Sequence, residues 1–171
     1  MHPGMVASLI IVFLLVCPAL SGQAHVVIGG SIPCMGQIAL AGDSVGSSRA
    51  IVAELKADES NRASVTLRLR TNCRFHVAAR LRDPTAGEAQ VISGAVTAAA
   101  GTDHLTPKAL ETQVRPATIA SGIAAAFLDG PPISRAGNNT TSDNAVLVQV
   151  VLQLPPGVRT TSAEFSLTLG N

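Results

Sequence analysis

Residues 64–82 read SVTLRLRTNCRFHVAARLR and carry the clearest strand pattern in the chain. Apolar or small side chains occupy the odd positions, which predicts a β-strand with one side against a core. The stretch is long for one strand, since strands usually have about 3–10 residues. We therefore predict a bend or break near residues 71–73. The inward positions keep the same parity throughout, which favours a continuous bent strand or an odd-length connection over a two-residue hairpin loop.

The even positions of this stretch form a basic stripe that contains no acidic residue. Its members are Arg68, Arg70, Arg74, His76, Arg80 and Arg82. Alternate residues on a strand lie about 7 Å apart, so these arginines repel unless an acid lies across from them. We expect that acid on a neighbouring strand, at Glu54, Asp58 or Glu59. Without such a partner, the five arginines become a candidate anion-binding surface; with one, they are the solvated side of a strand.

Further period-two segments at residues 37–41, 49–55, 146–154 and 163–169 predict more strands. Residues 83–87 (DPTAG) predict a turn, and residues 109–114 fit either one helical turn or a strand. Because many short strands are expected and few helices, the sequence predicts an antiparallel β-sandwich. The final strand has no charge beyond Glu164, so its edge would be a pairing hazard unless another strand covers it.

The N-terminus predicts a signal peptide over residues 1–24, followed by one domain over residues 25–171. Residues 6–16 (VASLIIVFLLV) are apolar but shorter than the roughly 20 residues that span a bilayer. Gly22-Gln23-Ala24 fits a signal-peptidase site, with cleavage after Ser21 as an alternative. The segment before the apolar run has no Lys or Arg, which leaves a retained signal anchor as another reading. A secreted, periplasmic or cell-surface protein is expected, with no membrane contact after cleavage.

Two cysteines remain after cleavage, Cys34 and Cys73, and in an exported chain they predict one disulfide. Such a crosslink stabilises a fold by about 4 kcal/mol in the chain-entropy model. Two free buried thiols are the alternative for a chain that stays in the cytosol.

The composition argues against several classes of partner. The chain has no Trp or Tyr and four Phe, whereas sugar-binding and single-strand nucleic-acid-binding proteins stack ligands on aromatic faces. The formal net charge of +1 predicts no partner by global electrostatics. We expect no nucleic acid partner and no cofactor.

The sequence contains no phosphate loop, no His-Glu-x-x-His and no Cys-x-x-Cys. We therefore expect a protein that is not an enzyme. Composition alone leaves a Ser-His-Asp site open, because the chain has serines, histidines and several aspartates, Asp129 among them. An alternative is a copper site, since a terminal His25 could chelate copper with a second histidine, His76 or His104.

With these features together, the chain resembles the exported β-sandwich subunits of bacterial surface fibres, namely the spore coat protein U-like family and the chaperone–usher pilins. The matching features are a signal peptide, Cys34 soon after cleavage, Cys73 at an alternating strand, and the final strand at residues 163–169 after Pro155-Pro156-Gly157. The resemblance implies an immunoglobulin-like fold and export with a periplasmic chaperone.

We accordingly expect a structural or adhesive subunit of a surface or extracellular assembly, with like subunits and a chaperone as partners. The alternatives are the copper-binding protein and a freestanding module that binds anions through Arg68, Arg70, Arg74, Arg80 and Arg82.

Overall fold

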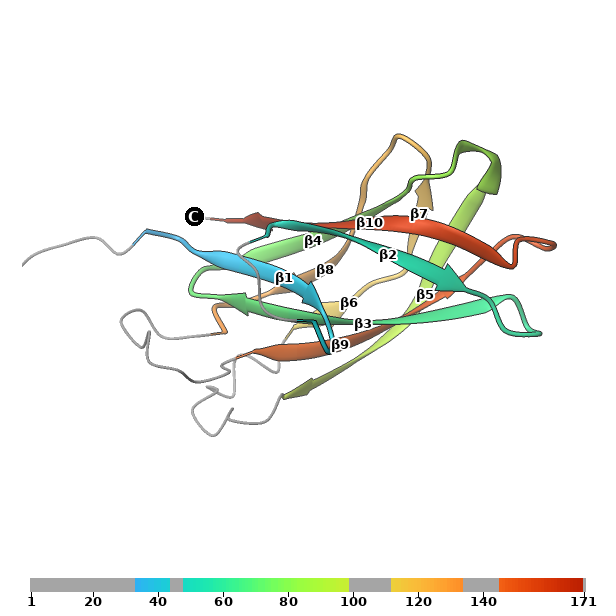
Figure 1. Cartoon of the computed structure of the whole chain (residues 1–171). Helices are drawn as coiled ribbons and strands as arrows, with labels where there is room; N and C mark the ends of the chain where they lie inside the picture. The colour runs from blue at the N-terminus through green and yellow to red at the C-terminus, as the bar shows by residue number, and fades with distance from the viewer. Residues whose placement is uncertain (1–32, 44–47, 99–111, 134–144, 171) are drawn as a thin grey trace, which may run out of the picture. The chain divides into compact units, whose positions relative to one another are not determined.

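The described part of the chain consists of β-strands and one short 3-10 helix (Figure 1). The computed structural model describes residues 33–43, 48–98, 112–133 and 145–170, which belong to the compact unit Ile32–Asn171. The predicted signal peptide, His25 and His104 lie outside the described residues. The elements are β1 Gly36–Leu40, β2 Ala50–Lys56, β3 Arg62–Thr71, β4 Phe75–Leu81, η2 Pro84–Ala86, β5 Glu88–Ala98, β6 Gln113–Val114, β7 Ala117–Ala120, β8 Ala125–Gly130, β9 Val146–Gln153 and β10 Thr160–Leu169.

The strands form two antiparallel sheets that share one apolar core. The first sheet has the order β1-β3-β9-β5-β7, and the second has the order β2-β10-β4-β8-β6. Buried side chains from both sheets make one cluster, in which the rings of Phe127 and Phe165 meet edge to face with centroids 6.0 Å apart. The third phenylalanine of the described residues, Phe75, is also fully buried, so none of these three rings offers a stacking face to solvent. The prediction of an all-β, two-sheet fold is confirmed.

The stretch at residues 64–82 breaks where its pattern predicted. β3 ends at Thr71 and β4 begins at Phe75, so the connection has an odd number of residues, 72–74. The two strands belong to different sheets, and this connection carries the chain from one layer to the other. Because the connection is odd in length, the odd positions face the core on both sides of it.

Other predicted segments hold as well. β9 and β10 alternate as expected, with the even residues of β9 and the odd residues 161–167 of β10 buried. Residues 83–87 form a turn around η2, in which the Asp83 carboxylate accepts the Thr85 backbone N–H at 2.9 Å. Of the segment 109–114, Gln113 and Val114 form a strand, and residues 109–111 lie outside the described part.

The final strand is not an exposed edge. β10 pairs with β2 along one side and with β4 along the other, as Figure 1 shows. The edges of the second sheet are therefore β2 and β6. Because the backbone groups on both sides of β10 pair within the chain, the pairing hazard suggested by its single charge is removed.

The predicted disulfide is present and fastens the start of the described chain to the connection between β3 and β4. Cys34 and Cys73 are joined with their Cα atoms 5.5 Å apart. Asn72 strengthens the same junction. Its Oδ1 accepts the Met35 N–H at 2.7 Å, and its Nδ2 donates to the Pro33 carbonyl at 3.0 Å. Arg74 therefore directly follows two residues, Asn72 and Cys73, that are fixed by hydrogen bonds and by the disulfide.

Candidate functional site

The structure divides the basic stripe between the two outer faces of the sandwich. Arg68 and Arg70 lie on β3 in the first sheet, whereas Arg80 lies on β4 in the second. Their odd-numbered neighbours on both strands face the shared core, so the arginines point away from it in opposite directions. Arg74 lies in the connection, and Arg82 follows β4. The five predicted anion-binding arginines therefore do not form one surface.

Arg80 and Arg82 have an acidic neighbour that the sequence pattern did not identify. Glu164 on β10 is the register partner of Arg80, and both carboxylate oxygens lie 2.9 Å from Arg80 Nη2. Arg82 Nη1 lies 3.3 Å from Glu164 Oε2. The expectation of Glu54, Asp58 or Glu59 was wrong for this pair of arginines, because β4 is adjacent to β10 and not to β2. Within the second sheet, Glu164 therefore partly neutralises this part of the stripe.

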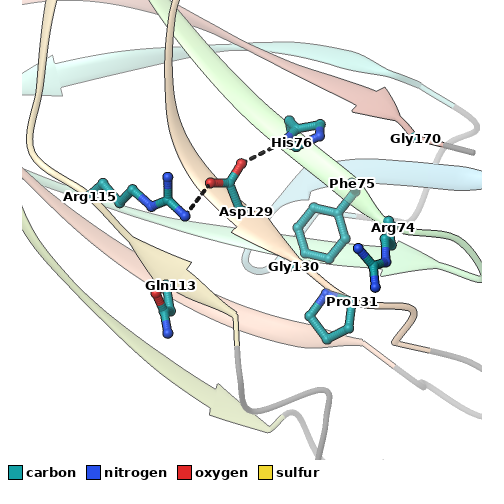
Figure 2. Close-up of a pocket in the computed structure, with 9 residues that line it drawn as sticks. All are labelled: Arg74, Phe75, His76, Gln113, Arg115, Asp129, Gly130, Pro131 and Gly170. Atoms are coloured by element: carbon teal, nitrogen blue, oxygen red, sulfur yellow. Dashed lines mark hydrogen bonds and ion pairs between the residues drawn. The ribbon is translucent and has the colours of Figure 1, made fainter.

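A pocket lies at the end of the second sheet, close to the connection between β3 and β4 (Figure 2). Its volume is about 460 Å³, and Arg74, Phe75, His76, Arg115, Asp129 and Pro131 are among the residues that line it. We call it the Asp129 pocket. Asp129 stands at its centre between two donors: Oδ1 contacts His76 Nδ1, and Oδ2 lies 3.1 Å from Arg115 Nη2.

An irregularity in β8 places Asp129 beside His76. The register between β4 and β8 shifts at Val77 and Ala78, which are paired with Leu128 and Ala126. The residue left between these pairs is Phe127, and both Phe127 and Leu128 are buried. A β-bulge of this kind resets the alternation of side chains. Asp129 therefore points outward, directly across from His76.

The floor of the Asp129 pocket depends on the glycine that follows. A Cβ atom on Gly130 would lie 2.3 Å from Cζ of Phe75, so only glycine lets this ring pack under β8. The ring is fully buried, and the half-buried Pro131 follows Gly130 along the pocket (Figure 2).

Arg74 supplies the pocket with a second guanidinium. The side chain is exposed, and it has no acidic partner among the residues that the structure describes. Its backbone is fixed, because its carbonyl accepts the Gly170 N–H at 2.8 Å and Cys73 of the disulfide precedes it. The pocket thus combines two guanidinium groups and an imidazole with one carboxylate.

Sequence reasoning singled out Arg74 and His76, but it did not predict that they line one pocket with Arg115 and Asp129. Asp129 was one of several aspartates open to pairing with a histidine, and Arg115 lies in a segment without a clear pattern. The contact between His76 and Asp129 joins residues 53 positions apart and depends on the pairing of β4 with β8. No local signal in the sequence marks that pairing.

The histidines of the copper alternative are not brought together by the described structure. His76 is bound to Asp129, and His25 and His104 lie outside the described residues. Among the residues described, no group of three or more His, Cys, Asp or Glu side chains is arranged to hold a metal ion. The copper site therefore stays a prediction from the sequence.

The outer edge of β2 is a second candidate surface. The backbone carbonyl of Arg49 accepts the Leu167 N–H, and the Ala57 N–H donates to the backbone carbonyl of Arg159. The odd residues of this segment therefore direct their backbone groups toward β10. The register with β10 is continuous, so the backbone groups of Val52, Glu54 and Lys56 point away from the sheet. Their side chains are exposed on its outer face, with Val52 48% exposed.

No protein-family model, curated protein or solved structure matches this chain. In the part of the chain that the structure describes, no helix is long and apolar enough to cross a membrane.

Proposed function

We propose that this chain is a non-enzymatic structural or adhesive subunit of a surface or extracellular assembly, and that its subunits associate through the outer edge of β2. The observation that carries the proposal is the row of outward-pointing backbone groups at Val52, Glu54 and Lys56. Export and a periplasmic chaperone are part of the proposal through the resemblance noted above.

The order of the strands supports an immunoglobulin-like fold. In such folds, strands A, B, E and D form one sheet and strands C, F and G the other. The run β1-β3-β9-β5 corresponds to A-B-E-D, and β4 next to β10 corresponds to C next to F. β2 occupies the place of strand G beside β10. A partner strand inserted beside β10 would have to displace β2, so addition at the edge of β2 is the simpler route to assembly.

The charges on β2 favour a second copy of the same chain as the partner. An antiparallel pair of β2 strands that is symmetric about Leu55 places Glu54 of each copy opposite Lys56 of the other. Both residues present their backbone groups to this edge, so each pair also exchanges main-chain hydrogen bonds, roughly four in total. Within one copy the two side chains lie 3.7 Å apart and are exposed, so they are free to exchange partners. Opposite charges directly across a ladder contribute about 0.2–1 kcal/mol each.

Charge reversal on β2 tests this interface. We expect the purified protein, with its disulfide formed, to show a concentration-dependent dimer in sedimentation equilibrium. Glu54→Lys and Lys56→Glu each place like charges opposite one another at both ends of the pair, so each should weaken the dimer about tenfold. The double variant exchanges the two charges and should restore the dimer.

Arg62→Gln on β3 is the matched control, since Arg62 is exposed in the other sheet. A protein that stays monomeric at high concentration contradicts the proposal. So does a dimer that both single variants leave unchanged, because its contact would then lie elsewhere.

A further inference from the structure

We propose that the Asp129 pocket binds a small organic anion, with a carboxylate or phosphate group held by Arg74 and Arg115 and an apolar group resting on Pro131. This site goes beyond the proposed assembly and does not depend on it, because the pocket is built on β4, β6 and β8 and the interface on β2.

The charges of the pocket favour an anion. Two arginines, Arg74 and Arg115, line the pocket together with one carboxylate, Asp129, which already accepts from Arg115 and contacts His76. Arg115 Nη2 is the nitrogen that is engaged, and the other donors of its guanidinium remain for a ligand. Arg74 has no acidic partner among the described residues, so its whole fork is also available. Guanidinium forks bind carboxylates and phosphates through paired hydrogen bonds.

Asp129 acts as a positioning residue. Its two oxygens hold His76 and Arg115 on either side of the pocket, as the dashed lines in Figure 2 show. The contact with His76 uses Nδ1 and leaves Nε2 at the opposite side of the ring. The Asp129 carboxylate fixes the positions of these donor groups and also lowers the net positive charge of the pocket. The lower charge favours a ligand with one anionic group over a polyanion.

The shape of the pocket favours an organic ligand over an inorganic ion. Its volume of about 460 Å³ lies within the usual range for small-molecule sites, about 300–1,000 Å³. Beside the charged groups, Gly130 and the half-buried ring of Pro131 line it. An inorganic ion would leave the ring of Pro131 uncovered, whereas an organic group can cover it.

Binding of four small probes to the full protein tests the inference: phenyl phosphate, benzoate, inorganic phosphate and neutral benzamide. Calorimetry gives the affinities, and amide and guanidinium NMR signals give the location. We expect phenyl phosphate or benzoate to shift the signals of Arg74, Arg115 and Gly130. The tighter of these two identifies the anionic group. Benzamide and inorganic phosphate should each bind about tenfold more weakly, because each lacks one half of the interaction.

Arg74→Gln and Arg115→Gln should each weaken the tighter probe about tenfold, whereas Arg62→Gln should not. The amide spectrum of each variant shows whether its fold is kept. If neither aromatic anion binds at millimolar concentration, or if inorganic phosphate binds as tightly as phenyl phosphate, the inference is overturned. An equal loss in Arg62→Gln overturns it as well, since binding would then follow surface charge. The dimer of the proposed assembly is measured separately and is expected in all three variants.

Discussion

Glu164 on β10 lies directly opposite Arg80 on β4, and both of its carboxylate oxygens are 2.9 Å from Arg80 Nη2. Arg82, which follows β4, reaches the same carboxylate, so one acid partly offsets the charges of two arginines on the outer face of β4 and β10. Only 18% of the Glu164 side chain is exposed, whereas Arg80 and Arg82 are about half exposed. The contact therefore has a structural purpose, since it relieves the repulsion that an uninterrupted basic stripe would create.

Glu164→Gln should lower the free energy of unfolding by about 1 kcal/mol, because it leaves Arg80 and Arg82 without their shared charge. Urea denaturation measures this change. Glu88→Gln is the control, since Glu88 is exposed on β5 and should change stability by less than about 0.5 kcal/mol. Equal effects of the two variants would show that the contact contributes nothing specific.

Much of the fold follows from alternation alone. The odd positions of residues 64–82 are core positions on both strands, and the unchanged parity predicted the odd connection at residues 72–74. The sequence does not show that this connection crosses from one sheet to the other, which separates Arg68 and Arg70 from Arg80. The sequence also does not show which acidic residue pairs with Arg80 and Arg82. Glu164 is 84 residues from Arg80, and the pairing arises from strand order, which local patterns do not encode.

Replacing both cysteines, Cys34→Ser with Cys73→Ser, should lower the free energy of unfolding by about 2–4 kcal/mol. The crosslinked residues are 39 positions apart, and such a loop restricts the unfolded chain substantially. Denaturation of the original protein in a reductant should give the same loss. If reduction leaves the midpoint unchanged, the disulfide does not stabilise this fold.

Gly130→Ala should destabilise the protein by about 1–3 kcal/mol, because the new Cβ would lie 2.3 Å from the buried ring of Phe75. Gly36→Ala is the comparison, since its new Cβ would meet the ends of flexible leucine side chains at Leu167 and Leu169. It should cost less. Phe75→Leu combined with Gly130→Ala should cost less than the sum of the two single changes. Strict additivity would contradict the proposed packing.

The pKa of Asp83 lies below its ordinary value of 3.8, because the Thr85 hydroxyl and then the Thr85 backbone N–H donate to its carboxylate. A lowered pKa means that this carboxylate stabilises the fold above the ordinary value. That contribution is lost as the pH falls through the folded pKa. Thr85→Val removes the hydroxyl and keeps the N–H, so the Asp83 pKa should rise part of the way to 3.8. A carboxyl-carbon NMR titration measures it, and an unchanged pKa would rule out the hydroxyl as the main cause.

Amide hydrogen exchange along β2, measured in dilute and in concentrated protein, tests the proposed assembly most directly. The amides of Ala53 and Leu55 face β10 and should be protected at both concentrations. The amides of Glu54 and Lys56 face the open edge, and they should exchange rapidly in dilute protein and become protected when concentrated. Rapid exchange of Glu54 and Lys56 at both concentrations would contradict the account, because no second strand would then be paired with β2.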